Sequence, residues 1–114
     1  MTLNSGLTKL DMETIIRVFE KYPEIETAVL YGSRAMGAYQ KGSDIDIALK
    51  GKKLTSGICS HVHFELEEET LLPYFFDITD YQNIKNEKLK DHIDRVGKVI
   101  YGIGGGDQIF TQTP

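Results

Sequence analysis

The stretch YGSRAMGAYQKGSDIDIAL, residues 31–49, decides the fold of this chain. It continues the apolar and β-branched run Thr27–Tyr31, which predicts a strand that ends at Gly32 in a tight turn. Residues 33–43 are mostly polar or small, and they predict a loop with room for one helical turn. A second strand is predicted at residues 44–49. Strand ends beside such turns are common positions for functional side chains.

Two aspartates share one face of this second predicted strand. Successive side chains of a strand point to opposite faces, so Ile45 and Ile47 face one way while Asp44 and Asp46 face the other. A later alternating run carries Asp77 on the face opposite to its apolar neighbours. The pattern therefore predicts two carboxylates that point the same way, and a third on a neighbouring strand.

The remaining sequence predicts helices and strands in alternation. Helical spacing of apolar residues predicts helices at residues 8–21, 54–72 and 87–96, the last with Asn86 as N-cap and Gly97 just past its end. Alternation predicts a strand at 74–79, and a short apolar run follows at 99–101. We therefore expect one α/β domain over residues 1–101, and the glycine-rich segment 102–114 predicts a flexible tail.

Composition limits the class of protein. A length of 114 residues fits one domain, and 17 acidic against 13 basic residues give a net charge of -4, so extended nucleic-acid binding is not expected. The single cysteine, Cys59, cannot form an internal disulfide. The opening residues do not resemble a signal peptide, and no run of about 18 apolar residues could span a membrane. We expect a cytoplasmic protein.

Three aspartates beside a glycine turn suit nucleotidyl transfer. This reaction needs divalent cations to neutralise charge on the attacking and leaving oxygens, and Mg²⁺ prefers oxygen ligands such as carboxylates. Asp44, Asp46 and Asp77 have the right parity to supply them. Backbone N–H groups at a glycine turn also make a seat for phosphates, and Gly32 and Ser33 lie at such a turn.

The spacing of these residues resembles a known family signature. Gly32-Ser33, ten intervening residues and then Asp44-Ile45-Asp46 resemble the DNA polymerase β-like nucleotidyltransferase superfamily, and the local sequence is similar to its minimal nucleotidyltransferase branch. The resemblance implies a small mixed sheet flanked by helices (α+β), two Mg²⁺ ions and ATP as donor. It also implies that Gly32 and Ser33 bind phosphates, that Asp44 and Asp46 bridge the metals, and that Asp77 is the third ligand.

The same resemblance implies an activity and a partner. We expect transfer of AMP from ATP to an acceptor hydroxyl with release of pyrophosphate. The acceptor implied is a separately encoded helical HEPN-type toxin, which this chain would modify on a tyrosine as the antitoxin of the pair. One alternative is a catalytically silent subunit that binds nucleotide within a two-protein complex. A drug-modifying enzyme of the aminoglycoside nucleotidyltransferase kind is a third reading, which the short length disfavours.

Other polar residues leave alternatives open. Arg34 and Ser43 are candidate nucleotide contacts, although side chains beside turns are often only solvated. Asp80 could compete with Asp77 as the third ligand, but its parity on a strand is opposite. A zinc site at Cys59 and its two neighbouring histidines would lack a fourth ligand and a second pair. His92 is expected on the exposed side of the last helix.

Overall fold

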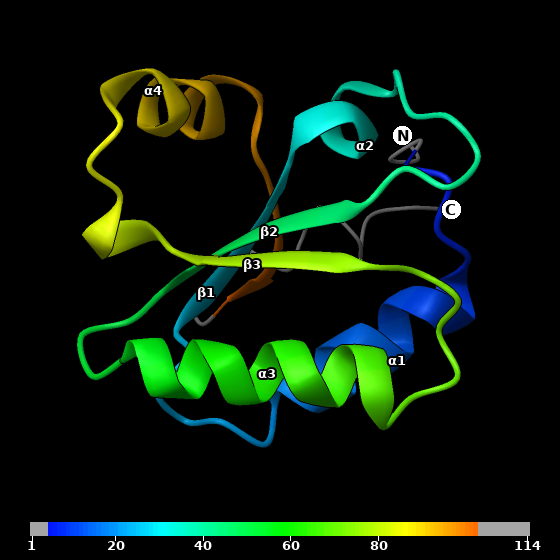
Figure 1. Cartoon of the computed structure of the whole chain (residues 1–114), viewed down its shortest axis with the longest axis horizontal. Coiled ribbons are helices and arrows are strands. Elements are labelled where there is room, and N and C mark those ends of the chain that lie inside the picture. Colours follow the sequence, from blue (N-terminus) through cyan, green and yellow to red (C-terminus); the bar gives the residue numbers. More distant parts are fainter. Residues whose placement is uncertain (1–4, 103–114) are drawn as a thin grey trace.

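A four-stranded sheet with the strand order β3-β2-β1-β4 is the frame of the fold (Figure 1). The structure is a computed structural model, and it describes residues 5–102. In chain order the elements are α1 (Lys9–Phe19), β1 (Thr27–Tyr31), α2 (Gly32–Met36), β2 (Ile45–Lys50), α3 (Ser56–Glu68), β3 (Phe76–Asp80), the 3-10 turn η1 (Tyr81–Asn83), α4 (Glu87–Val96) and β4 (Lys98–Gly102). β1 is antiparallel to β2 and β4, whereas β2 and β3 are parallel. The expected fold class, a mixed sheet flanked by helices, is confirmed.

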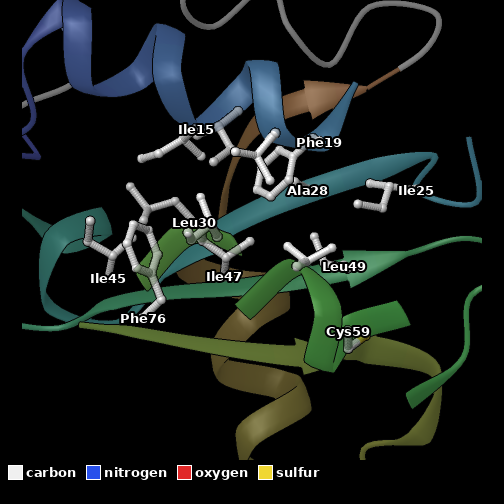
Figure 2. Close-up of a cluster of buried hydrophobic side chains, with 14 of the residues drawn as sticks. Ile15, Phe19, Ile25, Ala28, Leu30, Ile45, Ile47, Leu49, Cys59 and Phe76 are labelled. Carbon is white, nitrogen blue, oxygen red and sulfur yellow. The ribbon is translucent and has the colours of Figure 1, made fainter. Parts of the chain in front are cut away.

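The main core lies between one face of the sheet and the helices α1 and α3 (Figure 2). Ile45, Ile47 and Leu49 of β2 are fully buried in this core, with Phe19 of α1 and Leu66 of α3. A slip of one residue would turn all three β2 side chains to the opposite face, so their burial fixes the register of the strand. The core therefore also fixes Asp46 on the other side of the sheet.

That other side is covered by α4, with α2 beside it (Figure 1). Ile93 of α4 packs in a second cluster with Val29 of β1 and Ala48 of β2. Ala48 is therefore buried although it shares its face with the aspartates. The candidate site has a hydrophobic cluster on one side and the α2 turn on the other.

The helices α1 and α4 both begin at side-chain caps. Thr8 Oγ1 accepts a hydrogen bond from Asp11 N at 2.9 Å, and Asp11 Oδ2 accepts one from Thr8 N at 3.0 Å, which is a complete capping box at the start of α1. Asn86 Oδ1 accepts hydrogen bonds from the backbone N–H groups of Lys88 and Leu89. The predicted N-cap of the last helix is thus confirmed.

The segment between α3 and β3 differs from the prediction. α3 ends at Glu68 and not at Leu72, because Leu71 is fully exposed and gives no core contact that would extend the helix. β3 begins at Phe76 and not at Tyr74, because the Tyr74 hydroxyl donates to Asp11 Oδ2 at 2.7 Å and ties this residue to α1. Tertiary contacts therefore set both boundaries.

The last strand uses the apolar run at residues 99–101. β4 ends at Gly102, and the rest of the predicted tail, residues 103–114, lies outside the described residues. Within residues 5–102, no helix has the length and apolar character needed to cross a membrane.

Two glycines allow a matched test of the packing. A Cβ at Gly97 would lie 2.5 Å from Val29 Cγ1 and would also overlap the Ile93 carbonyl oxygen, whereas a Cβ at Gly57 in α3 would meet only Thr55 Oγ1 at 3.7 Å. We predict that Gly97→Ala lowers the free energy of unfolding by about 1–3 kcal/mol through overpacking. Gly57→Ala should raise it by about 0.5–1 kcal/mol through higher helix propensity. Urea unfolding measures both, and equal effects of the two substitutions would contradict the packing described for α4 and β4.

Candidate active site

Asp46 and Asp77 lie side by side on the parallel strands β2 and β3. They are direct register partners, and neighbouring strands are about 4.7–4.9 Å apart. Both lie on the face opposite to the main core, because the flanking residues Ile45, Ile47 and Phe76 are buried in that core. Asp44 precedes β2 by one residue and is exposed. The structure thus places Asp46 beside Asp77 as the sequence parity predicted.

The turn at the end of β1 lies against Asp46. Tyr31, the last residue of β1, is the register partner of Asp46, and Gly32 follows with a φ of +74°. A Cβ on Gly32 would overlap Asp46 Oδ2, so glycine is required here both by the left-handed backbone and by the carboxylate. Ser33 is the second residue of α2, where the backbone N–H groups have no partner within the helix. Among residues 5–102 the Ser33 hydroxyl has no hydrogen-bond partner, so a ligand could form a hydrogen bond with it.

The gathered negative charge shows in the acidity of Asp46. Its pKa is raised to about 6, first by burial and then by the negative charges of Asp77 and Asp44. The positive charges of His92 and Arg34 oppose this shift without cancelling it. A bound cation would reverse the balance, since it favours the ionised carboxylate.

The donor set fits a hard cation such as Mg²⁺. All three aspartates offer oxygen ligands, which Mg²⁺ prefers, and the raised pKa of Asp46 marks a place where positive charge is lacking. Within the part of the chain that the structure describes, however, no three carboxylate, imidazole or thiolate groups are close enough to form a complete metal site. The carboxylates would have to close around an ion as it binds.

Arg34 occupies a different place from the one expected for a nucleotide contact. It is 3% exposed, and its guanidinium donates from Nη1 to the Ser5 carbonyl at 2.8 Å and from Nη2 and Nε to the Ser43 carbonyl at 2.9 and 3.2 Å. The rings of Tyr39 and Tyr74 lie 5.2 and 5.1 Å from the guanidinium carbon. Arg34 therefore holds the peptide group that immediately precedes Asp44.

Ser43 belongs to the same support. Its hydroxyl accepts a hydrogen bond from Gln40 N at 2.8 Å, and its own N–H donates to the Gln40 carbonyl at 3.0 Å. These bonds close the loop before β2. In the described conformation Ser43 shapes the approach to Asp44, and its hydroxyl is already used.

His92 lies closer to the aspartates than the sequence predicts. His92 was expected on the exposed side of its helix, but it is half-buried, and its ring meets that of Tyr31 edge-on with centroids 6.1 Å apart. It is close enough to Asp46 for its charge to lower the pKa of that carboxyl. The signal that could have found it is its helical spacing of three residues from Leu89 and four from Val96, both of which pack inward.

The histidines of α3 do not form a zinc site with Cys59. Cys59 is buried, and desolvation raises its pKa to about 11, which opposes the thiolate form that zinc needs. His63 Nε2 pairs with Glu67 Oε2 at 3.0 Å, and His61 is exposed. Cys59, His61 and His63 therefore have separate surroundings in the described part of the chain.

A mixed sheet that presents adjacent aspartates beside a glycine turn defines the core of a nucleotidyltransferase. The family described as "Polymerase beta, Nucleotidyltransferase" matches residues 13–103. Because this match covers most of the chain, the protein belongs to that family. No curated protein matches the sequence.

Solved structures with a similar fold include toxin–antitoxin complexes. One was solved with AMP-PNP and matches with 23% identity and a TM-score of 0.70, covering 90% of this chain and 82% of that chain. Another is a tri-AMPylated HEPN toxin of Shewanella oneidensis in complex with an MNT antitoxin, at 22% identity, a TM-score of 0.64 and coverage of 90% and 78%. A nucleotidyltransferase of Sulfolobus solfataricus matches with 22% identity, a TM-score of 0.51 and coverage of 83% and 79%. At these identities the likeness establishes the fold.

The first prediction from this site concerns stability without metal. In the folded protein the pKa of Asp46 is raised from its ordinary value of 3.8 to about 6, so ionisation of Asp46 opposes folding. The penalty is absent below pH 4, grows between pH 4 and 6 and is complete above pH 6. In EDTA, thermal unfolding should therefore show Asp46→Asn to be more stable than the wild type at pH 8, by about 1 kcal/mol in unfolding free energy after allowance for solvent screening, and equally stable at pH 3.5. A wild type that is more stable than Asp46→Asn at pH 8 would refute this account of the charge.

The second prediction concerns Arg34. Lysine keeps the charge but cannot reproduce the fork that bonds both carbonyls, so Arg34→Lys should leave at least one buried carbonyl unpaired and cost about 2–4 kcal/mol in unfolding free energy. The exposed Arg17 of α1 provides the control, and Arg17→Lys should change stability by less than about 0.5 kcal/mol. Denaturant titration of the two variants measures the difference. Equal stability of both would show that Arg34 is not a structural brace.

Proposed function

We propose that this protein transfers AMP from ATP to a hydroxyl group of a partner protein and releases pyrophosphate. The observation that carries the proposal is the position of Asp46, which lies against the Gly32 turn on one side and beside Asp77 on the other. Burial and the neighbouring carboxylates raise the pKa of Asp46, and this arrangement gives the fold no evident benefit. Such an arrangement is typical of a site that is completed by cations and phosphates.

Each part of the site has a role in this reaction. Gly32 and Ser33 would bind the β- and γ-phosphates of ATP through backbone N–H groups and the free Ser33 hydroxyl. Asp44, Asp46 and Asp77 would hold two Mg²⁺ ions. The ions supply neutralisation of the charge on the attacking and leaving oxygens.

Asp77 would act on the acceptor. It lies on the outermost strand, β3, and is exposed, so an acceptor can approach it from the edge of the sheet. The acceptor oxygen forms a bond to the α-phosphorus of ATP, the bond from that phosphorus to the bridging oxygen of pyrophosphate breaks, and the hydroxyl proton passes to the Asp77 carboxylate. The reaction needs no reactant other than ATP and the acceptor hydroxyl.

Arg34 and Ser43 would act indirectly. Because Arg34 holds the Ser43 carbonyl, it fixes the peptide group before Asp44 and so limits where the Asp44 carboxylate can go. We propose that both residues position Asp44. This replaces the direct nucleotide contact expected from the sequence.

The proposed partner is a helical HEPN-type protein. The support is the fold of the MNT antitoxin found in complex with a tri-AMPylated HEPN toxin. In such a pair this chain would be the antitoxin, acting in the cytoplasm where ATP is available. Acidic and aromatic surface residues are candidates for contact with this partner. Glu65 is already bonded to Lys21 and Tyr22, whereas Phe75 is 73% exposed. Phe75 lies two residues before Asp77, so it is the better candidate contact.

One observation favours the alternative, a subunit that binds nucleotide without transfer. No three ligands converge on a metal position within residues 5–102. If the carboxylates do not close when Mg²⁺ and ATP bind, nucleotide would be held without reaction. The experiment below separates the two functions.

Labelling with ATP tests the proposal. The purified protein is mixed with Mg²⁺, ATP labelled at the α-phosphate and an extract of the source cells, and we expect one protein to take up the label. Asp46→Asn and Asp77→Asn should each lower the rate at least about 100-fold, because each removes a carboxylate that would hold the cations needed for the reaction. Asp91→Asn on the exposed face of α4 is the control and should keep the wild-type rate.

The outcomes divide clearly. Labelling that persists in the Asp46→Asn variant would contradict the proposed mechanism. Saturable binding of ATP in a calorimeter, without label in any protein, would support the silent subunit.

A further inference from the structure

Within residues 5–102, the outer edge of β3 carries backbone groups that have no hydrogen-bond partner. β3 lies at one edge of the described sheet, with β2 as its neighbour (Figure 1). In a parallel pair, alternate residues turn their backbone groups toward the neighbouring strand. Ile45 N donates to the Phe75 carbonyl at 3.0 Å, so Phe75, Asp77 and Thr79 face β2. The even-numbered residues Phe76 and Ile78 therefore face outward.

The two outward-facing residues, Phe76 and Ile78, differ in the hydrogen bonding of their backbone groups. Glu67 Oε2 of α3 accepts a hydrogen bond from Phe76 N at 2.7 Å. Within residues 5–102 no comparable bond reaches the outward N–H or carbonyl of Ile78. The open stretch of the edge thus begins beside Asp77, whose side chain lies on the carboxylate face.

A hollow of about 540 Å³ follows this open edge. The hollow lies between α3 and β3 and extends to Asp44. Its lining includes Ser56, Ser60 and His63 from α3, Ile78 from β3, and the carboxylates Asp44 and Asp77. The hollow therefore joins the edge of the sheet to the proposed active site.

We propose that the acceptor binds here as an extended peptide segment, which adds a strand to the outer edge of β3. This inference rests on the proposed function, because it names the form in which the acceptor hydroxyl reaches Asp77. Strand addition uses backbone hydrogen bonds for affinity, and Ile78 offers a donor and an acceptor for them. The hollow has room for side chains on the α3 side of the added segment.

The geometry of an added strand positions the hydroxyl. Side chains of an extended segment alternate between the two faces of the sheet, so every second one lies on the face of Asp46 and Asp77. Strands are about 4.7–4.9 Å apart, which brings a side chain beside Asp77 within reach of the α-phosphorus. Its oxygen bonds to that phosphorus, pyrophosphate leaves and the proton passes to Asp77. A segment in a regular helix could not pair with the edge of β3 in this way, because the backbone groups of a helix are already hydrogen-bonded to one another.

Synthetic peptide pools test the proposal with the full chain, Mg²⁺ and α-labelled ATP. Each pool holds nonapeptides with serine, threonine or tyrosine at the centre and random flanking residues without proline. Two further pools are N-methylated at alternate backbone positions, one at the parity of the central residue and one at the opposite parity. Strand addition predicts labelling of the unmodified pool, and loss of at least tenfold in one methylated pool only, because just one set of amides faces β3.

Substitutions on α3 locate the groove. Ser60 is exposed and lines the hollow, so Ser60→Trp should fill it and lower peptide labelling at least tenfold, with the KM for ATP unchanged. Ser60→Ala keeps the hollow open and should label peptides within twofold of the wild type. Glu68→Trp adds the same bulk to α3 at an exposed position outside the hollow, and it should also behave as wild type.

The remaining outcomes overturn the proposal. Equal labelling of both methylated pools, loss of both, or no labelled peptide at all would show that the edge of β3 does not take an extended acceptor. The same result from Ser60→Trp and Glu68→Trp would count against the groove. The proposed function is judged separately, by labelling of the partner protein in cell extract, so its failure is distinguishable from failure of this site.

Discussion

The contact between the Asp46 carboxylate and the Gly32 turn is the constraint on which the rest of this structure depends. Asp46 reaches this position only because Gly32 has no side chain and adopts a φ of +74°. The same contact brings a carboxylate next to the backbone N–H groups that open α2, so the groups that we propose for cation and phosphate binding share one corner of the sheet. The electrostatic consequence is a carboxyl group whose pKa is raised to about 6.

The order of the strands in the sheet positions the groups that make this contact. β2 lies between β1, which supplies the glycine turn, and β3, which supplies Asp77, and its apolar side chains are buried on the opposite face. Arg34 adds a second constraint, since it bonds the carbonyl that precedes Asp44. Rigid elements thus set two of the aspartates, while the third sits at the end of a braced loop. This division suits a site that closes when an ion binds.

Much of this arrangement could be predicted from local patterns. The alternation at residues 44–49 gave the face of Asp46, the parity of Asp77 gave its place beside Asp46, and Asn86 marked the start of α4. Long-range contacts could not be predicted in this way. The burial of Arg34 depends partly on the Ser5 carbonyl and the Tyr74 ring, which are far from it in sequence, and the approach of His92 to Asp46 depends on how α4 crosses the sheet. Periodicity along a helix or strand carries no information on such pairings.

We propose that the aspartates and the Gly32 turn make one site for nucleotide and cation together. Calorimetric titration of ATP into the protein, once with Mg²⁺ and once with EDTA at the same ionic strength, measures whether the two bind together. Three carboxylates without a cation would repel the triphosphate, so we expect one saturable site with Mg²⁺ and an affinity at least about tenfold weaker in EDTA. Equal affinity under both conditions would contradict the account, because the carboxylates would then take no part in binding.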